Sequence, residues 1–258
     1  MENFNPSQEM YCQSDCEIAS KCLDCVQQDM AASKEGVLLA NNPPRYAKWH
    51  FEDVGLFRVV MGEDVDPLLH GIYQAKNVAL PMIEMQNQMD GRRRRRFSKE
   101  EAKLLLLTHV LHDYHEGITG DIAADDKTSD INRNELRVNQ QLVARLYNLE
   151  ADHPFLLKMW ETMDETGFDE NGDSFVNRAF HAGEQCGYFL TGIKAWSLRE
   201  HKSLTSEEQA KCKDMGIKVA SAAARHLLDN MSDFKYCDYL LGAHAVALGE
   251  IEDGMDSR

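Results

Sequence analysis

The sequence predicts an all-α protein, on three observations. Its 258 residues include only six prolines, and long segments are rich in Leu, Ala, Met, Glu and Gln, which are good helix formers. No segment alternates polar and apolar residues in the way that a half-buried strand does. The strand–helix–strand rhythm of a parallel sheet is also missing. We therefore expect a bundle of helices joined by polar connections.

Each expected helix is bounded by capping residues, turn residues or proline. The helices are expected over residues 16–34, 66–89, 99–116, 135–150, 153–165, 174–198, 203–229 and 236–250. The segments expected to be loops or turns are 35–48, 90–98, 117–134 and 171–173. Pro81 predicts a kink in the 66–89 helix, because proline has no backbone N–H to donate. Ser98 and Glu101 form a capping-box pattern, which predicts the start of the 99–116 helix.

Size and charge restrict the classes of function. A chain of 258 residues can bury a core without disulfides, and we expect a helical core over residues 41–258 with a cysteine-containing N-terminal extension over residues 1–40. Asp and Glu number 43 against 28 Lys and Arg, which gives a net charge of −15. This charge argues against a protein that binds nucleic acid or anionic membranes through its whole surface.

The sequence also predicts a cellular compartment. It has no apolar run of about 18 residues, so no transmembrane helix is expected. Its first residues are polar and acidic, which predicts that they are not a secretory signal. The seven cysteines are odd in number and lack the spacing of a disulfide framework. They predict free thiols in a reducing, cytoplasmic compartment.

The segment from Leu104 to Asp121 carries the residues with the richest chemistry. On a helix, His109, His112, Asp113 and Glu116 fall within an arc of about 100°, and leucines fall on the opposite side. Three histidines lie within seven residues, which is unusual for a solvated polar face rich in Lys, Glu and Gln. Imidazole and carboxylate groups together are typical of sites for Zn, Mn, Fe, Co or Ni. A metal site and a solvated face are both open from the pattern alone.

The pattern His112-Asp113-x-x-Glu116-x-x-Thr119-Gly120-Asp121 resembles the signature of the HD-domain phosphohydrolases. It is most similar to their branch of 5'-deoxynucleotidase-like and dNTP phosphohydrolase enzymes. The resemblance implies an HD-domain helical bundle, here with an N-terminal helical extension. It also implies a divalent metal ion (Mn, Co, Zn, Mg or Fe) held by an upstream histidine, the His-Asp doublet and an Asp on a later helix. In the resemblance, Glu116 and Asp121 are the catalytic acid/base and water-orienting groups.

The upstream histidine implied by the resemblance is expected to be His70. The segment His70-Gly-Ile-Tyr-Gln-Ala opens a helix and resembles the family's corresponding segment. His50 is the competing candidate, in a less helical context. A histidine that starts a helix and packs against a loop is the structural alternative for His70. The preceding residues 62–69 depart from the family's pattern.

The fourth ligand is where the sequence departs most from the family, which has an Asp at this place. The segment Phe180–Leu190 contains no Asp, and Glu184 is the expected ligand because it preserves the charge. His181 lies one turn before it on the same face and is an alternative ligand or a substrate-binding group. The fallback ligands are Asp229, Asp233 and Asp238. A degenerate site without metal is a further alternative.

Two upstream residues, Arg45 and Trp49, roughly resemble the substrate-binding Arg-Trp pair of the nucleotidase branch, and surface packing is the alternative. The run Arg92–Arg96 is expected to form a solvated loop, a subunit contact or a site of phosphate attraction. Four N-terminal cysteines form either a small structural zinc site or a set of buried thiols. These are Cys12, Cys16, Cys22 and Cys25.

The function expected from the resemblance is hydrolysis of a phosphoester or phosphoanhydride of a (deoxy)nucleotide by metal-activated water. His70, His112, Asp113 and Glu184 would hold the metal. The family also implies a homo-oligomer. One alternative keeps the fold and changes the chemistry to a di-iron oxygenase, with His109 and His115 available for a second metal. The other is a degenerate HD protein that binds a nucleotide without turnover.

Overall fold

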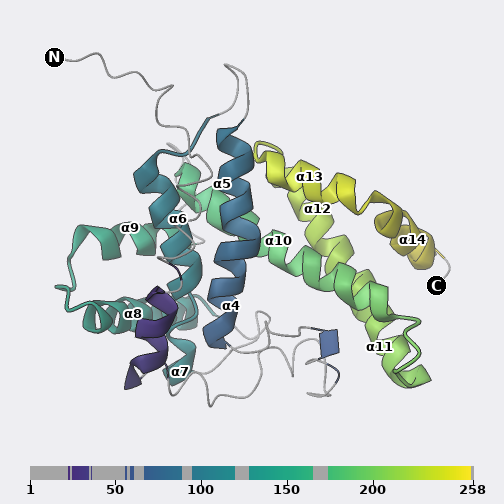
Figure 1. Cartoon of the computed structure of the whole chain (residues 1–258), viewed down its shortest axis with the longest axis horizontal. Coiled ribbons are helices and arrows are strands. Elements are labelled where there is room, and N and C mark those ends of the chain that lie inside the picture. The colour runs from purple at the N-terminus through teal and green to yellow at the C-terminus, as the bar shows by residue number, and fades with distance from the viewer. Residues whose placement is uncertain are drawn as a thin grey trace.

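All regular structure in the described part of the chain is helical (Figure 1). The computed structural model describes residues 23, 25–34, 36, 56, 59–60, 67–88, 95–119, 128–164 and 174–256. No strand occurs among these residues, which confirms the predicted all-α class. No helix in these segments is long and apolar enough to cross a bilayer.

The first long rod is a single run of helix that contains a proline. It consists of α4 (Pro67–Gln74), the π-helix η3 (Ala75–Ala79) and α5 (Leu80–Asn87). Pro81 cannot donate a hydrogen bond to the carbonyl of Asn77, four residues earlier. The Tyr236 hydroxyl donates to that oxygen instead, at 2.8 Å. The predicted 66–89 helix is therefore confirmed to within two residues at each end, and a π-helical turn accommodates its proline.

Helix α6 (Lys99–Leu111) packs against this rod and begins where the sequence predicts. The Ser98 hydroxyl accepts from the Glu101 N–H at 3.2 Å, and the Glu101 carboxylate accepts from the Ser98 N–H at 3.0 Å, which completes the capping box. The predicted end at residue 116 is wrong. A turn over residues 112–115 separates α6 from the short helix α7 (Glu116–Thr119).

Two further helices follow in the chain, of which the second packs against α6 and the first packs against the second (Figure 1). They are α8 (Ser129–Leu146) and α9 (Pro154–Met163). The sequence places residues 129–134 in a loop, and this is wrong. Thr128 caps α8, because its hydroxyl accepts from the Ile131 N–H at 3.3 Å. The first turns of α8 are polar and exposed on most sides, so apolar periodicity does not reveal them.

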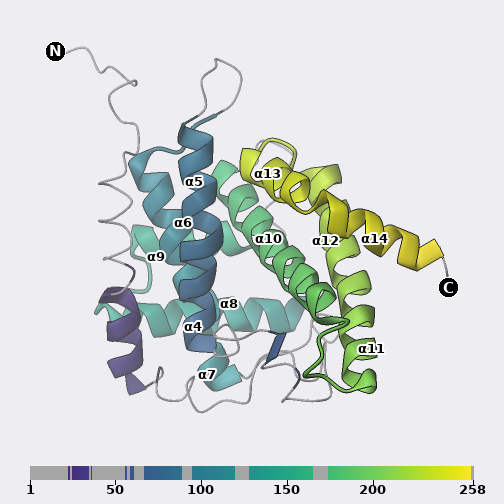
Figure 2. The same ribbon diagram turned by 45° about the vertical axis from the view of Figure 1, so that its right-hand side comes forward.

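The longest described helix, α10 (Phe175–Leu198), crosses the middle of the bundle. Figures 1 and 2 show it running between the α4–α5 rod and the C-terminal helices. It contacts α6, α9 and η3 on one side and α11, η5 and α12 on the other. Its bounds confirm the predicted 174–198 helix, with Ser174 as the N-cap. This helix therefore joins the two halves of the bundle, together with the contact between α13 and α5.

The C-terminal region forms a second rod and two shorter helices. The rod consists of α11 (Ser206–Met215), the π-helix η5 (Gly216–Ala220) and α12 (Ser221–Asn230). The shorter helices are α13 (Lys235–Ala243) and α14 (Ala245–Asp256). The rod confirms the predicted 203–229 helix apart from its first residues. The single 236–250 helix is wrong, because the chain breaks at His244, soon after Gly242, whose helix propensity is low.

The described part of the predicted N-terminal extension packs into the main core. Leu23 and Met30 are buried in the same hydrophobic cluster as the helices of the bundle. Ser33 and the Tyr114 hydroxyl form a hydrogen bond of 2.5 Å beside the turn after α6. Cys25 is exposed, and the other three cysteines of the N-terminal cluster lie outside the described residues.

Part of the arginine run is also described. Arg95 pairs with Glu101, and its guanidinium lies 4.6 Å from the centre of the Phe175 ring. Its carbonyl oxygen accepts from Gln86 at 3.0 Å. Arg95 therefore anchors the chain before α6, and residues 92–94 lie outside the described residues.

Candidate metal centre

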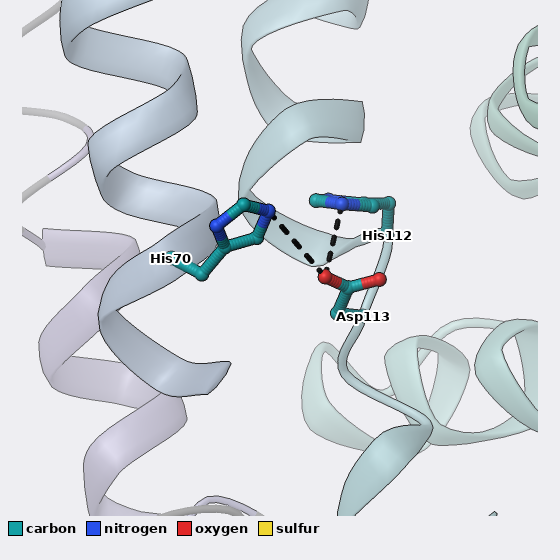
Figure 3. A group of neighbouring side chains, drawn as sticks. All are labelled: His70, His112 and Asp113. Carbon is teal, nitrogen blue, oxygen red and sulfur yellow. Dashed lines mark ion pairs between the residues drawn. The ribbon is translucent and has the colours of Figure 1, made fainter. Parts of the chain in front are cut away.

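Three side chains from two parts of the chain meet beside the end of α6. His70 comes from α4, and His112 and Asp113 come from the turn that follows α6 (Figure 3). One ligand atom of each lies within 4.8 Å of those of the other two. Both histidines are buried, with 4% and 6% of their surface exposed, and Asp113 is half-buried. The structure thus brings together the three residues predicted as the upstream histidine and the His-Asp doublet.

Close contact between α4 and α6 carries His70 to this position. A Cβ atom on Gly71 would overlap the carbonyl oxygen of Val110, so the two helices cross with backbone against backbone. His70 precedes this contact by one residue, and its Nε2 lies 3.7 Å from Oδ2 of Asp113. The competing candidate, His50, lies outside the described residues.

His112 and Asp113 converge because α6 ends before them. Consecutive residues of an α-helix point about 100° apart and do not face one another. In the turn, Nε2 of His112 lies 3.0 Å from Oδ2 of Asp113. The prediction that both lie on one face of a continuous 99–116 helix is therefore wrong in its geometry, although the two side chains do meet.

The leucine side of α6 faces the core in part, because Leu111 is completely buried whereas Leu104 and Leu107 are half-buried. The predicted polar side is buried too, since none of the His109 surface is exposed. The reason is that α4, α9 and α10 all pack against α6. His112, His115 and Glu116 are buried as well, and this burial excludes the alternative of a solvated polar face.

Backbone contacts determine which nitrogen of His112 faces the cluster. Nδ1 lies 2.7 Å from the carbonyl oxygen of His109. A carbonyl oxygen only accepts hydrogen bonds, so Nδ1 carries the hydrogen and Nε2 of the neutral ring presents a lone pair. That nitrogen faces carboxylate oxygens, at 3.0 Å for Asp113 and 3.6 Å for Glu184. A positive centre, either a metal ion or a second proton on His112, makes this arrangement favourable.

The donor atoms fit a divalent metal ion. Two ligands about 2.0–2.2 Å from one ion, at angles of about 90–110°, lie roughly 3.0–3.5 Å apart. The distances from Asp113 Oδ2 to the two imidazole nitrogens, 3.0 and 3.7 Å, are close to this range. Imidazole nitrogen and carboxylate oxygen suit Mn, Fe, Co, Ni or Zn. The donor set thus matches the expected cofactor class without selecting one ion.

Glu184, the expected fourth ligand, approaches the cluster from α10. Its Oε2 lies 3.6 Å from Nε2 of His112, and its Oε1 lies 3.4 Å from Nδ1 of His109. Burial alone would raise the pKa of this carboxyl. The positive charge that His112 carries when its ring is protonated, with contributions from His109 and His70, outweighs burial and lowers the pKa of Glu184 well below its usual range. Glu184 is therefore an ionised carboxylate beside the group of His70, His112 and Asp113, and its contact with this group is to the His112 ring.

Close packing of α10 against α6 and α4 brings Glu184 near the cluster. A Cβ atom on Gly183 would lie 2.6 Å from the His109 ring, so α10 and α6 touch at this point. A Cβ atom on Gly187 would overlap the Gln74 side chain of α4. The two glycines therefore allow close packing of α10, at Gly183 against α6 and at Gly187 against α4.

The other candidate ligands are not part of this group of three. His181 is half-buried, and its ring contacts Asn177 at 3.5 Å and the neighbouring Phe180 ring. Asp233 pairs with Arg178, whereas Asp229 and Asp238 are exposed. Within the described segments, His70, His112 and Asp113 are the one group of three or more possible ligands.

The predicted catalytic and substrate-binding residues are only partly described. Glu116 is buried, with 5% of its surface exposed, and it begins α7 directly after the turn that holds His112 and Asp113. Asp121, Arg45 and Trp49 lie outside the described residues.

Sequence reasoning missed two buried polar residues of α8 that contact this turn. Glu135 Oε1 lies 3.7 Å from Nε2 of His115, and Asn139 Nδ2 donates to the His112 carbonyl at 3.1 Å. Both are buried, on the same face of α8 as Leu142 and Val143. The spacing of these four residues is that of an amphipathic helix, which is the signal that could have identified them.

Comparisons with known proteins add no assignment to this geometry. No protein-family model matches the chain, and neither the curated proteins nor the solved structures include a match.

Proposed function

We propose that this protein is a metal-dependent phosphohydrolase that cleaves a phosphoester or phosphoanhydride bond of a (deoxy)nucleotide. The observation that carries the proposal is the buried group of His70, His112 and Asp113, in which an imidazole lone pair faces carboxylate oxygens. The resemblance of residues 112–121 to the HD-domain phosphohydrolases supports the reaction class.

The proposed chemistry assigns a separate task to each residue. His70, His112, Asp113 and Glu184 would hold a divalent ion, which lowers the pKa of bound water and neutralises phosphoryl oxygens. Glu116 is proposed to accept the proton of the attacking water and to return a proton to the leaving oxygen. The new bond joins the water oxygen to phosphorus, and the bond from phosphorus to the leaving oxygen breaks.

The nucleotide class of the substrate rests on the resemblance and on three side chains. The Arg45 guanidinium is proposed to bind phosphate, because its fork of N–H donors matches phosphate oxygens. Trp49 is proposed to stack on the base, and His181 is proposed as a phosphate contact one turn before Glu184.

A second candidate, a di-iron oxygenase, is favoured by one specific contact. Glu184 turns Oε2 toward His112 and Oε1 toward His109, so its two oxygens face two different imidazoles. A carboxylate in this position can bridge two ions. His109 would then be a ligand of the second ion.

A panel of substrates and metals tests the proposal. The metal-free protein is loaded separately with Mn, Co, Zn, Mg or Fe and incubated with nucleoside mono- and triphosphates. We expect metal-dependent release of phosphate, pyrophosphate or triphosphate from at least one substrate. Asp113→Asn should abolish this release. Asp130→Asn, which alters an exposed carboxylate paired with Arg133 on α8, should retain it.

The other outcomes separate the candidates. Oxygen consumption by the iron form, without phosphate release, would favour the oxygenase. Nucleotide binding without turnover under every metal would favour a degenerate binding protein. Hydrolysis that persists unchanged in Asp113→Asn would contradict the proposed site.

A further inference from the structure

Two side-chain donors hold the turn that carries His112 and Asp113. The carbonyl oxygen of His112 accepts from Nδ2 of Asn139 at 3.1 Å. The same oxygen lies 3.0 Å from Nδ1 of His115. Because a carbonyl oxygen cannot donate, Nδ1 of His115 carries the hydrogen and donates to it. Asn139 reaches this oxygen from α8, 27 residues further along the chain.

These donors replace a hydrogen bond of the α-helix. In an uninterrupted α-helix the His112 oxygen would accept from the N–H of Glu116. Here the Glu116 N–H donates to the Asp113 oxygen at 3.0 Å, and the Tyr114 N–H donates to the Leu111 oxygen at 3.1 Å. A buried carbonyl left without a donor costs about 1–3 kcal/mol. Asn139 and His115 therefore stabilise the turn relative to the continuous helix.

A second polar side chain of α8, Glu135, also lies beside this turn. Glu135 lies one turn before Asn139 on α8, and its Oε1 is 3.7 Å from Nε2 of His115. This distance is longer than a hydrogen bond, so the contact places a carboxylate beside the His115 ring without bonding to it. Asn139 is itself buried, with 1% of its surface exposed, so water does not compete freely for its amide.

We propose that Asn139, with His115, is a positioning residue of the metal centre. It holds the turn in which the adjacent His112 and Asp113 side chains meet at 3.0 Å, which an α-helix would direct about 100° apart. The inference rests on the metal site of the proposed function and is independent of the bond that is hydrolysed. Asn139 touches the backbone of a ligand and not the ion, so its effect is on ligand geometry.

The test measures metal affinity and coordination in the full-length protein. Asn139→Ala should weaken Co²⁺ or Mn²⁺ binding, measured by calorimetry, by roughly 10–100-fold. It should also change the visible absorption spectrum of bound Co²⁺, which reports ligand geometry. Asn139→Asp keeps the shape of the side chain and removes its N–H donor. This variant should show the same loss of metal affinity and the same change in the Co²⁺ spectrum. It keeps the test possible if Asn139→Ala does not fold.

Asn87→Ala is the matched control. Asn87 is also a buried asparagine that bonds to backbone, because it accepts from the Phe97 N–H at 2.8 Å and donates to the Phe97 oxygen at 3.3 Å. It lies roughly 25 Å along the α4–α5 rod from His70. Its variant should lose thermal stability while keeping wild-type metal affinity and Co²⁺ spectrum.

The outcomes separate this inference from the proposed function. Wild-type affinity and an unchanged Co²⁺ spectrum in a folded Asn139 variant would overturn the positioning role. Equal losses of affinity in the Asn139 and Asn87 variants would also overturn it, because they would reflect stability alone. A wild-type protein that binds no divalent ion would overturn the metal site itself.

Discussion

Glu184 and His181 lie one turn apart on α10, and Glu184 is the one that faces the His112 imidazole. We predict that Glu184→Gln, which keeps the shape and removes the charge, lowers metal affinity by more than about 100-fold. His181→Gln should leave the metal stoichiometry unchanged. Metal analysis of both proteins checks this. Loss of metal in the His181 variant alone would reverse the assignment.

Glu116 is buried beside the ligand-bearing turn and is predicted to act on protons, not on the metal. Glu116→Ala should retain bound metal and lower kcat by roughly 10²–10⁴, the usual contribution of a positioned acid or base. Steady-state kinetics and metal analysis of the same preparation are the measurements. If the metal disappears together with the activity, Glu116 is a ligand.

The sequence identifies the residues of the cluster better than their surroundings. His70, His112 and Asp113 follow from a motif and from the position of a histidine at the start of a helix, and the structure brings them together. Asn139 and Glu135 escape prediction because their role is a tertiary contact from α8 to a turn. The amphipathic spacing of α8 indicates that both residues are buried, but it does not show which group each of them contacts.

Between elements, glycine at position 183 allows α10 to touch α6. Gly183→Ala would place a Cβ atom 2.6 Å from the fully buried His109 ring. We predict a loss of about 1–3 kcal/mol in the free energy of unfolding, as for other overpacked sites, together with weaker metal binding as Glu184 moves away. Urea unfolding of the metal-free protein measures the first effect.

Gly242→Ala on α13 is the matched control, since its Cβ atom would meet nothing within 4 Å. This helical glycine should gain about 0.5–1 kcal/mol when replaced by alanine. Equal and small effects at both positions would show that α6 and α10 are not in close contact.

Because Pro81 has no N–H, the Asn77 carbonyl in the first rod receives its hydrogen bond from Tyr236 of α13. Burial raises the pKa of Tyr236, so its hydroxyl keeps the proton that it donates to the Asn77 oxygen at 2.8 Å. Tyr236→Phe should destabilise the protein by about 0.5–1.5 kcal/mol. Tyr239→Phe, which alters a side chain that is 56% exposed, should change stability by less than about 0.5 kcal/mol. Thermal unfolding compares the two, and equal effects would argue against the hydrogen bond to Asn77.

The sequence predicts which segments are helical better than it predicts where those helices end. The Ser98 capping box predicts the start of α6 because it is a local interaction. The end of α6 at Leu111 depends on Asn139, which comes from another helix. The pattern from Leu104 to Glu116 is compatible with a longer helix, so only the tertiary contact reveals the break.

For the whole molecule, the all-α class follows from composition, whereas the central place of α10 does not. The candidate ligands come from α4, from the turn after α6 and from α10, and these three helices pack together in one core. An ion that binds only the folded chain therefore links them. At a metal concentration of 100 times Kd, the free energy of unfolding should rise by about 2.7 kcal/mol. A melting temperature that does not respond to metal would contradict this linkage.

The number of divalent ions bound per chain tests the proposed metal centre most directly. Equilibrium dialysis followed by atomic absorption is applied to the wild type, to Asp113→Ala and to Asp130→Ala, the exposed control on α8. A centre built on His70, His112 and Asp113 predicts a tightly bound ion in the wild type and in Asp130→Ala. It predicts loss of that ion in Asp113→Ala with the helical circular dichroism unchanged. Equal metal content in all three proteins, or none in the wild type, would contradict it.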